Sequence, residues 1–94
     1  PLSFDIAANA KNIYVLMYFM VRYYEKVAIM SASTELIKKL YECIKEIFMN
    51  LSVLFNNAPE YLIKNKKYVS KYEALMIRFF EKNVFSEKDD IFIL

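Results

Sequence analysis

Basic and aromatic side chains alternate between Lys64 and Tyr72, and these residue types bind the backbone and bases of nucleic acids. Lysine ammonium groups contact phosphates, and tyrosine rings stack on unpaired bases. The lysines of this stretch are Lys64, Lys66, Lys67 and Lys71. Tyr68 and Tyr72 also recur at the spacing of a buried helical stripe, where they would be unable to stack on bases. The stretch therefore indicates either a nucleic-acid-binding segment or an exposed polar turn of a helix.

The carboxylates Glu42 and Glu46 come closest to a catalytic pair, because they stand four residues apart on one face of an expected helix. General acid–base catalysis needs a pKa that is tuned by burial in a cleft. Lysines surround this pair in the sequence, which is typical of a solvated face with mixed charges. Cys43 lies beside the apolar stripe of the same helix, and we interpret it as a small apolar filler rather than a nucleophile.

The chain contains neither histidine nor glycine. Without histidine, the usual general bases, Ser-His and Cys-His nucleophile pairs and most zinc and haem sites are excluded. Without glycine, the phosphate-binding loops of nucleotide-binding folds are excluded. We therefore expect no enzymatic activity, no cofactor, no metal site and no small-molecule substrate.

The single cysteine cannot form a disulfide within the chain, which favours a reducing compartment. The longest apolar run, Ile13 to Val21, is much shorter than the roughly 20 residues of a transmembrane helix. No signal-peptide pattern is visible. We expect a cytoplasmic protein without a transmembrane segment, and its frequent Lys, Asn, Ile, Tyr and Phe fit an AT-rich genome.

The size and composition predict a single all-α domain over residues 1–94, since 57% of the residues are hydrophobic and the net charge is only +2. A first helix is expected from about Asp5 to Met30, after an N-cap at Ser3. Its apolar seam, with steps of three and four, contains Ile6, Ala10, Ile13, Met17, Met20, Tyr24 and Val27.

The face of this first helix that lies opposite the seam is also apolar and aromatic. A helix that is apolar on nearly every side must be covered on nearly every side. Aromatic residues rimmed by basic ones resemble the composition of protein interfaces. The expected partner-binding residues are Lys11, Val15, Tyr18, Phe19 and Arg22. The alternative is that this helix is simply the central helix of the domain, surrounded by the rest of the chain.

A second helix is expected from Thr34 to Phe55, capped by Ser33. Its predicted seam contains Ile37, Leu40, Ile44, Ile47, Leu51 and Leu54, and it is widened by Tyr41, Phe48 and Phe55. We expect one nearly continuous third helix over residues 58–83, with a break near Asn65 as the alternative. Ser86 then begins a short closing element, which either folds onto the domain or docks elsewhere.

These patterns predict an antiparallel bundle of three long helices with a short C-terminal helical or docked tail. The expected function is that of a non-enzymatic protein-interaction or assembly module, self-associating or docking to a larger protein through the aromatic face of the first helix. The alternative is a small nucleic-acid-binding subunit that uses the segment Lys64–Tyr72.

Overall fold

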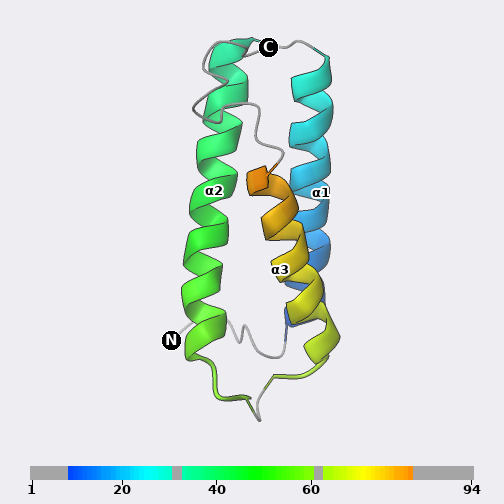
Figure 1. Ribbon diagram of the computed structural model, residues 1–94, viewed down its shortest axis with the longest axis vertical. Coiled ribbons are helices and arrows are strands. Elements are labelled where there is room, and N and C mark those ends of the chain that lie inside the picture. The colour runs from blue at the N-terminus through cyan, green and yellow to red at the C-terminus, as the bar shows by residue number, and fades with distance from the viewer. Residues whose placement is uncertain (1–8, 31–32, 61–62, 82–94) are drawn as a thin grey trace.

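A computed structural model describes residues 9–30, 33–60 and 63–81, which form three α-helices. They are α1 (Ala10–Ile29), α2 (Thr34–Asn57) and α3 (Lys66–Glu81). The chain rises along α1, descends along α2 and rises again along α3 (Figure 1). These three ranges contain no strand, so the prediction of an all-α fold with three helices is confirmed. The expected start of the first helix at Asp5 and the closing element after Ser86 lie outside the described residues.

The start of α2 follows the capping pattern seen in the sequence. The Ser33 hydroxyl accepts a hydrogen bond from the backbone N–H of Leu36 at 3.3 Å. This bond satisfies one of the N–H groups that have no partner within the first turn of a helix. Glu35 places its carboxylate in the same turn, where the helix dipole favours negative charge. The predicted cap is thus confirmed.

The third helix begins later than expected, because Asn65 has a positive φ of 55°. This left-handed conformation is incompatible with a continuing right-handed helix, and asparagine is one of the few residues that adopt it readily. The backbone N–H of Tyr68 donates to the carbonyl of Asn65 at 2.8 Å, which closes the first turn of α3. The expectation of one nearly continuous helix over residues 58–83 is therefore wrong, because residues 63–65 are not helical and α3 begins at Lys66.

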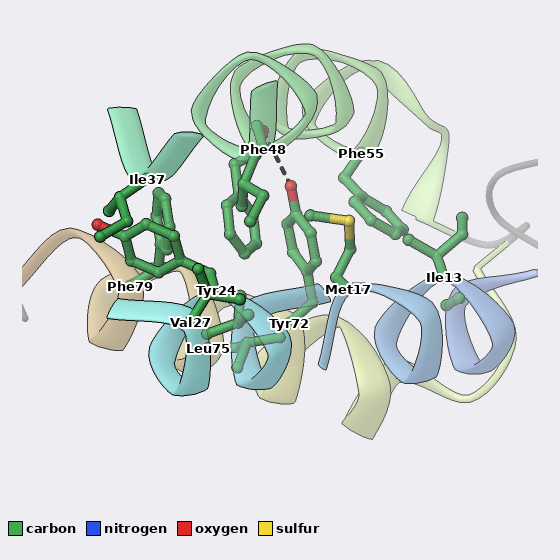
Figure 2. Packing of buried hydrophobic residues seen from close by; sticks show 13 residues of the cluster. Ile13, Met17, Tyr24, Val27, Ile37, Phe48, Phe55, Tyr72, Leu75 and Phe79 are labelled. Atoms are coloured by element: carbon green, nitrogen blue, oxygen red, sulfur yellow. Dashed lines mark hydrogen bonds between the residues drawn. The ribbon is translucent and has the colours of Figure 1, made fainter. Parts of the chain in front are cut away.

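Aromatic rings from all three helices fill the centre of the molecule (Figure 2). Phe48 of α2 is fully buried, with its ring centroid 5.4 Å from that of Tyr72 and 5.5 Å from that of Phe79, both on α3. On α1, Tyr24 lies 5.3 Å from Phe79. The residues of this core are Ala10, Ile13, Met17, Val21, Tyr24, Val27, Ile37, Ile44, Phe48, Phe55, Tyr72, Leu75 and Phe79.

The predicted seam of α1 matches the observed core closely. Five of the seven predicted residues are buried, Met20 is half-buried against the core, and Ile6 lies outside the described residues. Val21 is also fully buried, so the buried stripe is wider than the predicted seam. α1 packs against both other helices, which explains why more than one of its faces is apolar.

The buried stripe of α2 is rotated relative to the predicted seam. Phe48 and Phe55, which were expected only to widen the seam, are buried, whereas Leu54 is 49% exposed. The rings account for this rotation, because Phe48 and Phe55 both contact Tyr72 of α3. Aromatic side chains bury more area than leucine, and so their positions determine which side of the helix faces the core.

Candidate interaction surfaces on α1 and α3

α1 exposes a stripe of three large apolar side chains in its middle turns. Leu16 is 61% exposed, Phe19 63% and Tyr23 60%. They are separated by steps of three and four residues, which puts them on one face of the helix. We call these three residues the outer stripe. Val15, next to them, is 39% exposed.

The five residues predicted to bind a partner divide between two surfaces. Lys11, Val15 and Phe19 are exposed. Tyr18 is half-buried against the core, and its ring centroid is 5.7 Å from that of Phe19. Arg22 is also half-buried and is turned towards Glu25 and α3. Only part of the predicted set therefore lies beside the outer stripe.

Leu16 and Tyr23 were missed as candidate surface residues. Both lie in or beside the long apolar run, and their seven-residue separation is also the spacing of a buried seam. The seam positions Met17 and Tyr24 immediately follow them, so they belong to a separate stripe about 100° away on the helix. This offset indicates that Leu16 and Tyr23 lie on a different stripe from the seam. It does not indicate which of the two stripes the other helices cover.

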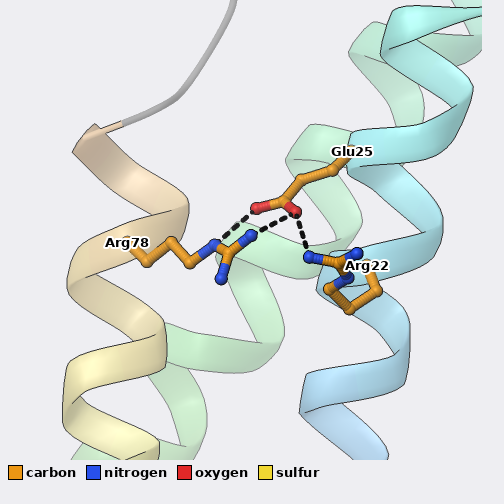
Figure 3. Close-up of polar contacts among 3 residues, drawn as sticks. All are labelled: Arg22, Glu25 and Arg78. Carbon is orange, nitrogen blue, oxygen red and sulfur yellow. Dashed lines mark hydrogen bonds and ion pairs between the residues drawn. The ribbon is translucent and has the colours of Figure 1, made fainter.

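An ion cluster connects α1 and α3 (Figure 3). Arg78 donates two hydrogen bonds of 2.8 Å to the Glu25 carboxylate, through Nε to Oε2 and through Nη2 to Oε1. Arg22 approaches Oε1 of the same carboxylate at 3.5 Å. The hydrogen bonds from Arg78 to Glu25, and then the charge of Glu25, raise the pKa of Arg78. The paired geometry fixes the guanidinium of Arg78 at the surface.

Lysine side chains of α3 lie over tyrosine rings in the first turns of this helix. The ammonium group of Lys71 is 6.0 Å from the ring centroid of Tyr14 and 5.6 Å from that of Tyr68. Lys67 is 5.3 Å from the centroid of Tyr68. Tyr14 and Tyr68 contact each other across the two helices at 5.8 Å. The cation–π contact with Tyr14 holds Lys71 close to α1.

The basic and aromatic segment predicted from the sequence is therefore split by the fold. Lys71 lies over Tyr14 of α1 and Lys67 over Tyr68 of α3. Lys66 forms an ion pair of 3.4 Å with Glu60, and Lys64 is exposed before the helix begins. Tyr72 is buried, and its hydroxyl donates to the carbonyl of Phe48 at 2.9 Å. Tyr72 thus cannot stack on a base, and Tyr14 of α1 joins the lysines instead.

The carboxylates of α2 do not form an enclosed site. Glu42, Cys43 and Glu46 are exposed, and with Ile47 and Asn50 they line a surface depression of about 320 Å³. Within residues 9–30, 33–60 and 63–81, no group of three His, Cys, Asp or Glu side chains could hold a metal ion. In the same ranges, no helix is long and apolar enough to cross a membrane.

No protein-family model matches this chain, and comparisons with curated proteins and with solved structures also give no match. We therefore infer function from the chemistry of the described surfaces. Two surfaces differ clearly: the outer stripe of α1 is apolar, and the face shared by α1 and α3 is cationic and aromatic.

Proposed function

We propose that this protein is a non-enzymatic interaction module that self-associates, or docks to a larger protein, through the outer stripe of α1. The observation that carries the proposal is the exposure of Leu16, Phe19 and Tyr23, each 60% or more, in one continuous stripe. Large contiguous apolar patches on soluble monomers often mark interaction sites. In this proposal an antiparallel bundle supports α1 and keeps the stripe in a fixed orientation.

A second copy of the chain is the first partner to consider. A two-fold contact would bury the outer stripe of both copies, because the same patch serves both partners. Complete burial of a large apolar side chain contributes about 1.5–3 kcal/mol, and these side chains are already partly covered. The total for both copies falls within the roughly 4–15 kcal/mol range that association costs, so any surplus that stabilises a dimer is small. We therefore expect a reversible dimer that dissociates on dilution.

The charges beside the outer stripe distinguish a second copy from an acidic partner. Lys11 and Lys26, near the two ends of the helix, are exposed. Two copies would bring lysines towards lysines, and salt would weaken that repulsion. Self-association should thus become tighter as salt rises, whereas docking to an acidic rim should become weaker.

Sedimentation equilibrium of the full chain at low and high salt tests this proposal. The test variant combines Phe19→Lys with Tyr23→Glu, both at exposed positions of α1. A matched control combines Met49→Lys with Val53→Glu on α2, where the side chains are 54% and 58% exposed. We expect the wild type and the α2 variant to self-associate and the α1 variant to remain monomeric.

Two results would contradict self-association through α1. One is a wild-type chain that is monomeric at every concentration and salt level. The other is an α2 variant that dissociates as completely as the α1 variant, because the contact would then not be specific to the outer stripe. Circular dichroism of both variants verifies that each remains helical.

A further inference from the structure

A surface groove of about 240 Å³ lies between α1 and α3. Its lining consists of Tyr14, Tyr18, Lys71, Ala74, Leu75 and Arg78. The small side chain of Ala74 leaves the groove unfilled, while two tyrosines stand on the α1 side. We call this feature the basic groove.

Cations lie at both ends of the basic groove and just before it. Lys67, Lys71 and Arg78 follow one another on one side of α3, at steps of four and seven residues. At a rise of 1.5 Å per residue, Lys71 and Arg78 are about 10 Å apart along the helix, and Lys67 lies about 6 Å further back. The shorter interval suits neighbouring phosphates of a single strand, and the longer one suits phosphates that are not adjacent along it. Glu25 is the facing carboxylate, and it is already bound by Arg78 and Arg22.

The three cations retain donors that can bind phosphate. A guanidinium has five N–H donors, and Arg78 uses two of them on Glu25. The lysines are exposed, and they are held in place by the rings of Tyr14 and Tyr68. A group with a planar ring and an attached phosphate would find aromatic surface and cationic donors together in this groove.

We propose that the basic groove binds a nucleotide unit of a single-stranded nucleic acid. Lys67, Lys71 and Arg78 contact phosphates of the same strand, and one base lies over Ala74 against the tyrosines of α1. A single strand fits better than a duplex, because its bases are free to leave the stack and contact aromatic side chains. This inference is independent of self-association, since the groove and the outer stripe use different residues.

Fluorescence anisotropy with a labelled single-stranded oligothymidylate tests the groove at about 50 mM salt, where phosphate contacts contribute strongly. We expect Lys67→Ala with Lys71→Ala to weaken binding and to reduce the slope of log affinity against log salt by about 0.7 for each phosphate that is no longer neutralised. The matched control is Lys38→Ala with Lys39→Ala on α2, which removes the same charge at exposed positions. Its affinity should stay close to that of the wild type.

A second variant tests the groove without changing any charge. Ala74→Leu fills the space between Lys71 and Arg78 at an exposed position of α3, where leucine is compatible with a helix. We expect it to weaken oligonucleotide binding while leaving the helical content unchanged. If the base does not enter the groove, this variant binds as tightly as the wild type, and the proposal is overturned.

Three further results would also overturn the proposal. The first is no measurable binding by the wild type at low salt. The second is an equal loss of affinity in the α2 control, which would indicate a general charge effect. The third is equally effective competition by polyglutamate or by a duplex of the same length, because the groove would then recognise an acidic polymer rather than a single strand.

Discussion

Tyr72 illustrates how one polar atom is accommodated among aromatic rings. Its side chain is buried between Phe48 and Phe55, and its hydroxyl donates to the carbonyl of Phe48 at 2.9 Å. The oxygen also lies 3.5 Å from the hydroxyl of Ser52. A buried hydroxyl without a partner would destabilise the fold, so these contacts make burial of this tyrosine possible.

Replacing this hydroxyl should change how stability depends on pH. Burial raises the pKa of Tyr72 above its ordinary value of 10.0, although the hydrogen bond with Ser52 acts in the opposite direction. Above that value the unfolded chain releases the proton before the folded chain does, so the free energy of unfolding falls as pH rises. We expect Tyr72→Phe to lose less stability than the wild type between neutral and strongly alkaline pH.

Urea unfolding at a series of pH values measures this effect. At neutral pH the variant should be less stable by about 0.5–1.5 kcal/mol, because one hydrogen bond is removed. Burial also raises the pKa of Tyr41. This residue remains in the variant, so part of the loss of stability at alkaline pH should remain. Parallel curves of unfolding free energy against pH for the wild type and the variant would show that ionisation of Tyr72 does not contribute to the loss of stability at alkaline pH.

Phe48 should be among the most costly residues to truncate. It is fully buried and contacts rings on α3 at 5.4–6.2 Å. Phe48→Ala should reduce the free energy of unfolding by about 3–5 kcal/mol, because it leaves a cavity between α2 and α3. The neighbouring Met49→Ala removes a side chain that is 54% exposed and should have a much smaller effect. Chemical denaturation measures the unfolding free energy of both variants. Similar losses for Phe48→Ala and Met49→Ala would contradict the assigned orientation of α2.

At the scale of the elements, the main difference between sequence and structure is the break at Asn65. The lysines around it interrupt the apolar pattern only briefly, so the pattern is compatible with a continuous helix. Hydrophobic periodicity reports which residues share a face, but it does not report the φ of a single residue. Asparagine is compatible with both interpretations, since it occurs in helices and in left-handed turns.

Two substitutions at Asn65 distinguish a broken helix from a continuous one by the sign of their effects. With φ at 55°, Asn65→Ala should destabilise the protein by about 1 kcal/mol, because a Cβ disfavours this conformation without a compensating polar group. Asn65→Gly should be neutral or slightly stabilising. In a continuous helix the order would be reversed, with alanine more stable than glycine. Thermal unfolding of the two variants gives the answer.

The helix faces were only partly predictable for a related physical reason. The seam of α1 was correctly placed, because steps of three and four residues identify one buried stripe. The second apolar face could not be assigned to a neighbour, since periodicity does not say on which side α3 packs. As a result, Tyr18 was grouped with Phe19, although it is half-buried beside α3 whereas Phe19 is exposed.

For the whole molecule, the fold separates an apolar surface from a cationic one. The outer stripe lies on α1 alone, and the basic groove lies between α1 and α3. Binding at the two surfaces should depend on salt in opposite directions. Salt screens the lysine repulsion that opposes self-association, whereas it reduces the counterion release that favours nucleic-acid binding. Measurements at several salt concentrations can therefore distinguish the two activities in one sample.

The most direct test of self-association through α1 is the melting temperature of the full chain at increasing chain concentration. Association of folded chains stabilises the folded state by mass action, so we expect the wild-type Tm to rise with concentration. The variant with Phe19→Lys and Tyr23→Glu should have a Tm that is independent of concentration. A wild-type Tm that stays constant, or a variant Tm that rises in parallel with it, would contradict the assignment of the outer stripe as the contact between copies.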